Sequence, residues 1–253
     1  MFPPQRYFIE LAYKGSAYHG WQFQPNAIAV QEVLNQAFQT YFRENIETLG
    51  CGRTDAGVHA TQFFAHLDLQ QTLLESDFSK IKKSLNGLLR DDISLKNIYP
   101  VHADAHARFD ATKRSYEYHI HFEKDPFKTD QSWLIKDKLD LDAMQIAAQM
   151  ILQYEDFGAF CKSNADNFTN ICKLTKSEFE FKNHGIIYHV SANRFLRNMV
   201  RAIVGTLIDI GKQKMAPEAM HQIIQSQNRS AAGSSVPAHG LFLTEVVYPY
   251  INH

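Results

Sequence analysis

The sequence predicts an α+β protein with two ferredoxin-like, or RRM-like, βαββαβ halves, residues 1–110 and 111–253, whose strands form a mixed, mostly antiparallel sheet with a central cleft. Segments in which apolar and polar residues alternate, as in half-buried strands, are separated by segments with helical spacing, and both halves show the same order of elements. The 253 residues are 45% hydrophobic and 12% aromatic, which is enough for one large core or two of ordinary size.

The first half is expected to run strand, helix, strand, strand, helix, strand. Near its beginning Tyr7, Ile9, Leu11 and Tyr13 alternate with polar or small residues, which indicates a strand. The strands located by this alternation are residues 6–14, 61–69 and 93–102. Apolar side chains three or four residues apart predict helices over residues 30–43 and 78–89.

The second half repeats this order of elements without any repeat of the residues themselves. Strands are expected over residues 113–122, 173–182, 185–193 and 241–248, and helices over residues 141–152 and 195–210. The second and third of these strands form a hairpin about Asn183 and His184. Two such halves side by side would leave a cleft, and Asp55 from the first half would face it.

The clearest chemical pattern lies in residues 50–60, Gly-Cys-Gly-Arg-Thr-Asp-Ala-Gly-Val-His-Ala, where a sharp turn presents Asp55 and Arg53 precedes it by two residues. The glycines that permit this turn are Gly50, Gly52 and Gly57. Taken alone, the pattern favours an aspartate that bonds its own turn and an arginine at the surface. The loop lies between a periodic helix and a strand, however, and functional sites are commonly built on such rigid flanks.

A second loop, residues 14–26, combines glycines, aromatic side chains and amides. This composition can stack on bases and form hydrogen bonds with their edges. The alternative is a structured loop in which Trp21 is simply buried, and the residues alone fit both interpretations equally well.

The strand over residues 113–122 places Arg114, Tyr116 and Tyr118 on one face, because side chains two residues apart point to the same side. Tyr116 could stack on a base that has been flipped out of its helix. The alternative is a cross-strand aromatic pair in the core, which we expect for one of the two tyrosines.

The helix over residues 195–210 carries Arg197 and Arg201 at the margin of its buried stripe, and Gly205 leaves room next to Arg201. An arginine in this position commonly extends to solvent; alternatively, it points into the cleft and pairs with a carboxylate. Residues 229–243, rich in Ser, Gly and Pro, form a loop that either closes the cleft or lies at the surface.

Charge and cysteine content limit the partners and the compartment. The chain has 26 Lys and Arg against 27 Asp and Glu, a net charge of −1, so an RNA substrate requires basic residues to gather locally. The candidate basic groups are Lys80, Lys82, Lys83 and Arg90, then Lys113 and Arg114, then Arg194, Arg197 and Arg201. Three scattered cysteines and the lack of a long apolar segment predict a cytoplasmic protein that does not enter the membrane.

Metal and nucleotide cofactors are not expected. The candidate ligand sets, His102-x-Asp104-x-His106 and His119-x-His121, come without a nearby cysteine or a second acidic cluster at zinc-site spacing. No Walker loop or Gly-x-Gly-x-x-Gly motif follows a predicted strand.

Residues 52–60 resemble the signature of the tRNA pseudouridine synthase A family, and further motifs extend the resemblance over nearly the whole chain. Those motifs are residues 20–26, 114–118, 157–160, 195–201 and 237–241, with minor departures at Cys51, Arg90 and Val236. The resemblance implies the pseudouridine synthase fold, with Asp55 as the catalytic residue, Tyr116 in the active site and Arg201 in contact with the aspartate. Arg53, Tyr116 and Arg201 are the residues expected to bind the substrate.

The resemblance further implies an isomerase that converts uridine to pseudouridine at positions 38, 39 and 40 in the anticodon stem-loop of tRNA, without a cofactor, as a homodimer. Asp55 could attack the ribose carbon of the glycosidic bond, attack carbon 6 of uracil, or remove a proton from the sugar. A nucleosidase would need a second carboxylate, and a non-catalytic RNA-binding module would have no use for Asp55.

Overall fold

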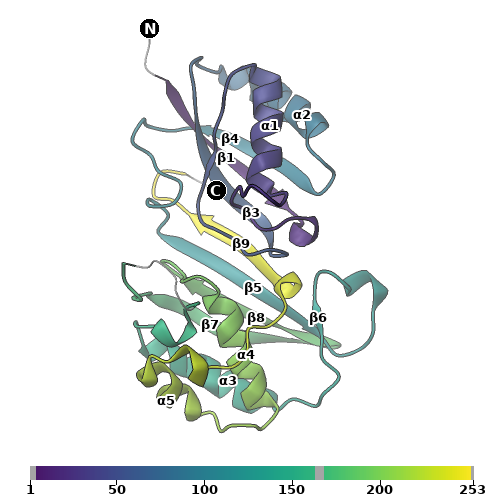
Figure 1. Ribbon diagram of the computed structural model, residues 1–253, viewed down its shortest axis with the longest axis vertical. Coiled ribbons are helices and arrows are strands. Elements are labelled where there is room, and N and C mark those ends of the chain that lie inside the picture. The colour runs from purple at the N-terminus through teal and green to yellow at the C-terminus, as the bar shows by residue number, and fades with distance from the viewer. Residues whose placement is uncertain (1–3, 163–167, 252–253) are drawn as a thin grey trace. The chain divides into compact units, whose positions relative to one another are not determined.

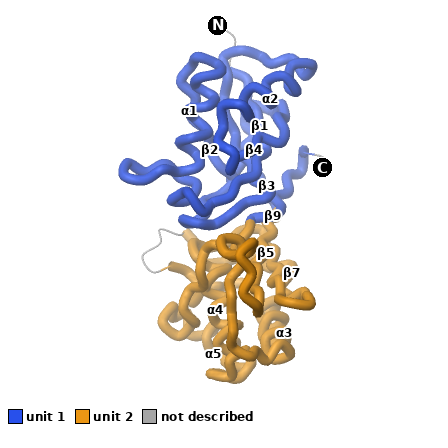
Figure 2. The backbone as a smooth tube through the Cα atoms, turned by 90° about the vertical axis from the view of Figure 1, so that its right-hand side faces the viewer, with its two compact units in different colours: residues 1–112, 243–253 blue, residues 113–242 orange. Residues whose placement is uncertain are grey.

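Each of two units of the chain has its own strands and helices (Figure 1, Figure 2). The structure is a computed structural model that describes residues 4–162 and 168–251. Unit 1 comprises residues 1–112 and 243–253, and unit 2 comprises residues 113–242. The last strand, β9 (Leu241–Val247), begins at the end of unit 2 and continues into unit 1.

Unit 1 runs strand, helix, strand, strand, helix, strand, as the sequence predicts. Its elements are β1 (Gln5–Tyr13), α1 (Val30–Phe42), β2 (Leu49–Gly50), β3 (His59–Leu69), α2 (Phe78–Leu88) and β4 (Ile93–Pro100). Antiparallel pairs give the spatial order β4-β1-β3-β2. The unit 1 part of β9 lies next to β3, where the Val246 N–H donates to Gln62 Oε1 at 2.9 Å.

Helices α1 and α2 lie on one face of the unit 1 sheet (Figure 1). The buried side chains of α1 recur at helical spacing: Val30, Leu34, Ala37 and Phe38. The helix ends at Arg43, whose left-handed backbone (φ 59°) lets its N–H donate to the Gln39 carbonyl. Burial of an aliphatic or aromatic side chain of this size stabilises the fold by about 1.5–3 kcal/mol.

Unit 2 repeats the strand arrangement of unit 1. Its elements are β5 (Lys113–His121), β6 (Trp133–Leu134), α3 (Leu141–Met150), β7 (Leu174–Lys182), β8 (Gly185–Ala192), α4 (Met199–Gly211) and α5 (Ala219–Ser226). Strand β8 lies between β5 and β7 and is antiparallel to both, as β3 lies between β1 and β2, whereas β6 pairs with β5 in parallel. The α+β class and the mixed, mostly antiparallel pairing are therefore confirmed.

The structure differs from the sequence prediction at several elements. Helix α4 begins at Met199, four residues later than predicted, because Asn198 adopts a left-handed conformation (φ 67°) and ends a turn closed by the Met199 N–H and the Leu196 carbonyl. The buried stripe of this helix is as predicted. The predicted order of unit 1 includes a strand between α1 and β3, but its residues were not located; it is the two-residue strand β2. The two-residue strand β6 and the eight-residue helix α5 were not predicted.

In unit 1, the backbone of the loop after β1 packs directly on the loop that precedes β3. The Trp21 N–H donates to the Thr54 carbonyl at 3.3 Å, and the Gly57 N–H donates to the Tyr18 carbonyl at 3.2 Å. Gly20 has φ +90°, and a methyl group added there would lie 2.4 Å from the Thr54 carbonyl oxygen. Only glycine combines this backbone conformation with this approach, so Gly20 fixes how closely the two loops meet.

Strand β3 of this sheet carries a buried histidine, His66. His66 packs against Phe8 with ring centroids 6.0 Å apart, and its Nδ1 accepts the Ala107 N–H at 3.1 Å. Burial, with the positive charge of Arg6 and of His106 when it is protonated, lowers the pKa of His66 to about 4, although Asp68 and Asp110 act in the opposite direction. The imidazole is therefore neutral in the folded protein at neutral pH.

We expect Gly20→Ala to lower the free energy of unfolding by at least about 2 kcal/mol, because alanine must adopt positive φ and its methyl group meets the Thr54 carbonyl. Gly52→Ala is the matched control, since a methyl group at Gly52 has no atom within 4 Å, and its effect should stay within about 0.5 kcal/mol. Urea denaturation of the two variants gives both values. Equal effects would show that the loop contact does not require glycine.

We expect stability to fall as the pH drops from about 6.5 towards 4, because unfolded His66 binds a proton near pH 6.5 whereas the folded residue resists it down to about pH 4. The loss attributable to His66 between pH 7 and pH 5 should be about 1–2 kcal/mol. In His66→Asn the side-chain carbonyl can still accept the Ala107 N–H but does not titrate, so its melting temperature should depend less on pH. Parallel slopes for wild type and variant would contradict this account.

Candidate active site

Asp55 begins a β-turn in unit 1. The Val58 N–H donates to the Asp55 carbonyl at 3.1 Å, and Gly57 occupies the third position of the turn with φ +80°. A type II turn requires this positive φ, which explains the glycine. Asp55 is half-buried, and Arg53, two residues earlier, is exposed. The turn thus holds the carboxylate at the loop surface, between solvent and the core.

The residue before Asp55 is fixed on two sides. The Thr54 hydroxyl forms a buried hydrogen bond of 2.8 Å with the Tyr13 hydroxyl, and the Thr54 carbonyl accepts the Trp21 N–H. Tyr13 is the last residue of β1, so the position of Asp55 is tied to the sheet. The sequence does not predict this link between Thr54 and Tyr13, and its one signal is that Tyr13 ends the alternating segment on the buried side.

Trp21 is buried, with 1% of its surface exposed, and its ring stacks on Phe63 with centroids 4.1 Å apart. Gly50 lies against the indole: a methyl group there would come within 2.6 Å of the ring. Of the two interpretations of the loop over residues 14–26, burial is therefore right for Trp21. Its ring packs against Gly50 and its main-chain N–H bonds the Thr54 carbonyl, so Trp21 supports the Asp55 loop. Phe23, 53% exposed, remains available for contacts from the same loop.

Tyr18 holds the other side of the turn through its carbonyl, which accepts the Gly57 N–H. Its hydroxyl donates to Asp92, and the guanidinium of Arg90 lies 5.5 Å from the centre of its ring. Burial, together with the hydrogen bond to Asp92, raises the pKa of Tyr18 above its usual value, so this tyrosine stays protonated. Arg90 thus has a local role as a neighbour of Tyr18.

In unit 2, the tyrosines of β5 differ in exposure. Tyr118 is fully buried and donates to the Pro237 carbonyl at 2.8 Å, and burial raises its pKa. Tyr116 is half-buried and meets Phe195 edge-on, with centroids 5.1 Å apart. The core interpretation thus applies to Tyr118, and Tyr116 keeps part of its ring accessible. Arg114 is buried, and its Nη1 donates to the Asn193 carbonyl.

Arg201 is the third residue of α4 and is bound to the loop that follows α5. Its Nε donates to the Val236 carbonyl at 2.8 Å, and the Val236 N–H donates to the Arg201 carbonyl at 3.2 Å. The prediction that Gly205 makes room for Arg201 is wrong: a methyl group at Gly205 would lie 1.9 Å from the Ser234 carbonyl oxygen, so the loop backbone takes that room. The loop therefore orients Arg201.

The position of Arg201 does not favour helix stability. A cation in the first turn meets the partial positive charge of the helix N-terminus, which disfavours it by about 0.3–1 kcal/mol. Arg197, four residues earlier, is exposed and lies outside the helix. Helix stability therefore does not account for a cation at Arg201.

Of the four histidines considered as metal ligands, three form other hydrogen bonds. His119 Nε2 lies 2.9 Å from Glu117, His121 Nδ1 bonds Ser132, and His106 Nδ1 accepts main-chain N–H groups. Over residues 4–162 and 168–251, no three His, Cys, Asp or Glu side chains are grouped so that they could hold a metal ion. None of the three cysteines, all of which lie within the described residues, forms a disulfide, and burial raises the pKa of Cys172 to about 11.

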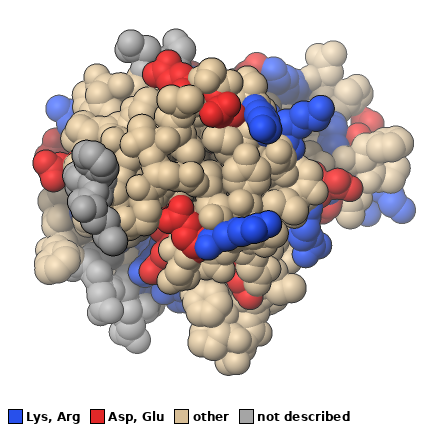
Figure 3. Space-filling view, turned by 90° about the horizontal axis from the view of Figure 1, so that it is seen from above, with Lys and Arg blue, Asp and Glu red and all other residues tan. Residues whose placement is uncertain are grey.

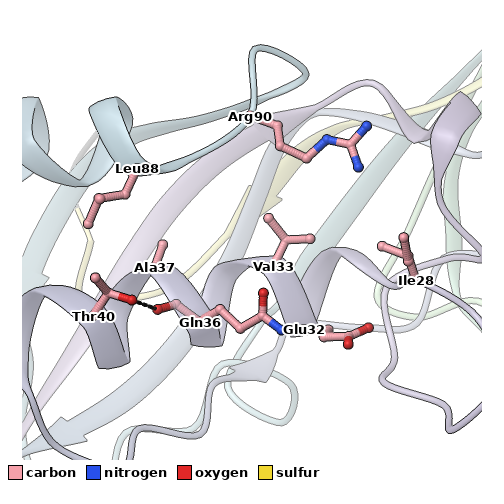
Figure 4. Close-up of a pocket in the computed structure, with 8 residues that line it drawn as sticks. All are labelled: Ile28, Glu32, Val33, Gln36, Ala37, Thr40, Leu88 and Arg90. Atoms are coloured by element: carbon pink, nitrogen blue, oxygen red, sulfur yellow. Dashed lines mark hydrogen bonds between the residues drawn. The ribbon is translucent and has the colours of Figure 1, made fainter.

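A groove of about 450 Å³ lies between α1 and the C-terminal end of α2 (Figure 4). It is lined by Ile28, Glu32, Val33, Gln36, Ala37, Thr40, Leu88 and Arg90, and thus by none of the predicted site residues.

On the face in Figure 3, Lys and Arg side chains are interspersed with Asp and Glu. Among the described helices, none combines the length and apolar character needed to cross a membrane.

Known proteins are similar to this chain over nearly its whole length. A family model described as tRNA pseudouridine synthase matches residues 147–249. The tRNA pseudouridine synthase A of Bacteroides fragilis is 47% identical over 246 residues, which cover 97% of this chain and 97% of that protein. That of Azobacteroides pseudotrichonymphae is 45% identical over 244 residues, covering 96% and 97%. The Chlamydia muridarum protein is 35% identical over 251 residues, covering 98% and 94%. Because this identity extends over nearly the full length of both chains, the chain belongs to the tRNA pseudouridine synthase A family and is an isomerase that acts on tRNA.

Proposed function

We propose that the protein converts uridine to pseudouridine at positions 38, 39 and 40 in the anticodon stem-loop of tRNA, with Asp55 as the catalytic residue and without a cofactor. The observation that supports this most is the way Asp55 is held. Its turn is bound to Tyr18, and the preceding Thr54 is bound to both Tyr13 and Trp21. Rigid support of this kind is what a catalytic side chain requires.

The residues of unit 2 fit the other needs of the reaction. A uridine inside a stem must be unstacked, which costs a few kcal/mol, and an aromatic ring can recover part of that by stacking. Tyr116 is partly exposed and is held edge-on by Phe195, so it can offer a fixed ring to the base. Arg201, oriented by Val236, would pair with Asp55, and Arg53 would bind the substrate from the Asp55 loop.

Asp55 then acts by one of three routes. The carboxylate attacks the ribose carbon of the glycosidic bond, attacks carbon 6 of uracil, or removes a proton from the sugar. In each case the glycosidic bond from N1 breaks, the uracil rotates, and carbon 5 bonds to the ribose. Carbon 5 then loses its proton and N1 gains one, and Asp55 gives up the bond or the proton that it took, so the product is an isomer of the substrate. A closed pocket is needed to retain the detached base, since water would otherwise release it.

This proposal divides the chain by role. Residues 1–110 carry the Asp55 loop, residues 111–253 carry the Tyr116 strand and the Arg201 helix, and both parts act on the same substrate uridine. The enzyme acts in the cytoplasm as a homodimer, in which local groups of Lys and Arg from two chains combine into one basic surface for the tRNA, although each chain has a net charge of −1.

We expect purified protein, with a chelator present, to form pseudouridine in unmodified tRNA that bears uridine at positions 38–40. Asp55→Asn should bind the same tRNA and form no product, because the amide is neither a nucleophile nor a base. Asp91→Asn, which changes an exposed carboxylate on the turn before β4, should retain activity. Chemical mapping of pseudouridine gives the product at each position.

The alternatives make different products. Release of free uracil without pseudouridine would identify a nucleosidase, and binding of tRNA without any product would identify an RNA-binding module. Full activity of Asp55→Asn would remove Asp55 from the mechanism.

We expect Arg201→Ala to lower kcat by about 100-fold, since a catalytic group displaced by about 1 Å loses roughly that factor. Arg197→Ala removes an exposed arginine four residues away and should change kcat less than about twofold. Single-turnover kinetics on tRNA, with melting temperatures of both variants, separate a catalytic effect from unfolding. Equal kcat values for the two variants would contradict a role for Arg201 in the reaction.

A further inference from the structure

An exposed aromatic residue lies in unit 1 away from the Asp55 loop, on the segment between β4 and β5. Phe109 has 73% of its surface exposed. Its ring lies 4.3 Å from the His106 ring, centroid to centroid and tilted by 34°, and the guanidinium of Arg108 lies 5.6 Å from its centre. We refer to His106, Arg108 and Phe109 as the Phe109 platform.

The backbone of the Phe109 platform is fixed by its own polar groups. His106 Nδ1 accepts the N–H of Arg108 at 3.1 Å and that of Phe109 at 3.3 Å. The His106 N–H donates to Asp110 Oδ2 at 2.7 Å, and the Asp110 N–H donates back to the His106 carbonyl at 3.0 Å. These bonds close a tight loop with Phe109 at its tip.

Three side chains from other parts of unit 1 form hydrogen bonds with this loop. The buried His66 accepts the Ala107 N–H, and Tyr248 donates to the Ala107 carbonyl at 2.6 Å. Tyr250 donates to Asp110 Oδ2 at 2.7 Å. The exposed ring is therefore presented on a rigid support, although its own exposure means that it buries little apolar surface and contributes little to stability.

Within residues 4–162 and 168–251, the other exposed phenylalanines lack this arrangement. Phe127 is 90% exposed on the loop after β5, and within the described part of the chain it has no aromatic ring as a neighbour. Burial lowers the pKa of His106, so the ring beside Phe109 is neutral at pH 7 and adds no charge. Arg108 supplies the cation, next to an open aromatic face.

We propose that the Phe109 platform binds an unpaired base of the tRNA substrate, which stacks on Phe109 while Arg108 contacts the adjacent phosphate. Aromatic rings stack on bases of any sequence, and an arginine beside the ring adds both cation–π and phosphate contacts. This inference rests on the proposed function and extends it, since the platform binds tRNA outside the catalytic loop.

The test compares the dissociation constants of unmodified tRNA at one salt concentration for wild type, Phe109→Ala, Phe109→Trp and Phe127→Ala. Loss of one stacked base should raise Kd by about tenfold or more in Phe109→Ala, whereas Phe109→Trp should bind within about twofold of wild type. The added tryptophan emission of Phe109→Trp should be quenched by tRNA. Phe127→Ala, the matched exposed phenylalanine, should bind as wild type does.

Light scattering of each variant separates base stacking from a contact between copies of the chain. Unchanged Kd in Phe109→Ala would overturn the proposal, as would a higher Kd that accompanies a change of oligomeric state. Pseudouridine formation by wild type is measured alongside. If wild type converts uridine and Phe109→Ala binds tRNA normally, only the platform is wrong. If wild type forms no product and Phe109→Ala still binds tRNA more weakly, the platform stands and the proposed reaction is wrong.

Discussion

The contact between two backbones in unit 1 determines the position of Asp55. The loop after β1 reaches the loop before β3 so closely that Gly20 has no room for a side chain against the Thr54 carbonyl. Hydrogen bonds from Trp21 and to Tyr18 then hold the second loop on both sides of Asp55. Because Thr54 is also bonded to Tyr13 at the end of β1, the position of the carboxylate follows from the sheet rather than from the loop alone.

A similar close contact between backbones, made possible by a glycine, occurs in unit 2 around Arg201. A glycine on α4, Gly205, admits the backbone of the following loop, and that loop in turn bonds Arg201 through Val236. In each unit, a glycine therefore lets two backbone segments come into direct contact, and that contact fixes the residue proposed to act in the reaction, Asp55 in unit 1 and Arg201 in unit 2. A near-neutral chain can act on an RNA in this way, since specificity comes from a few oriented groups rather than from overall charge.

The sequence predicted the long elements because period-two and helical patterns are clear over nine to thirteen residues, as in β1 and α1, and it predicted a mixed, mostly antiparallel sheet but not the order of its strands. It could not locate β2 and β6, which are too short for a pattern, or the start of α4, which depends on the left-handed backbone of Asn198. The contacts of Gly205 with Ser234 and of Thr54 with Tyr13 join residues far apart in sequence. Such contacts are decided by packing, which hydrophobic periodicity does not specify.

The most direct test of the account is an experimental structure of Asp55→Asn with an unmodified tRNA. The account predicts that one uridine of the anticodon arm is flipped out of its helix, with its ring against Tyr116 and the residue 55 side chain beside its ribose and uracil. A uridine that remains stacked in the arm, or one that is flipped into a site without residue 55 and Tyr116, would contradict the central claim that these two residues act on the same nucleotide.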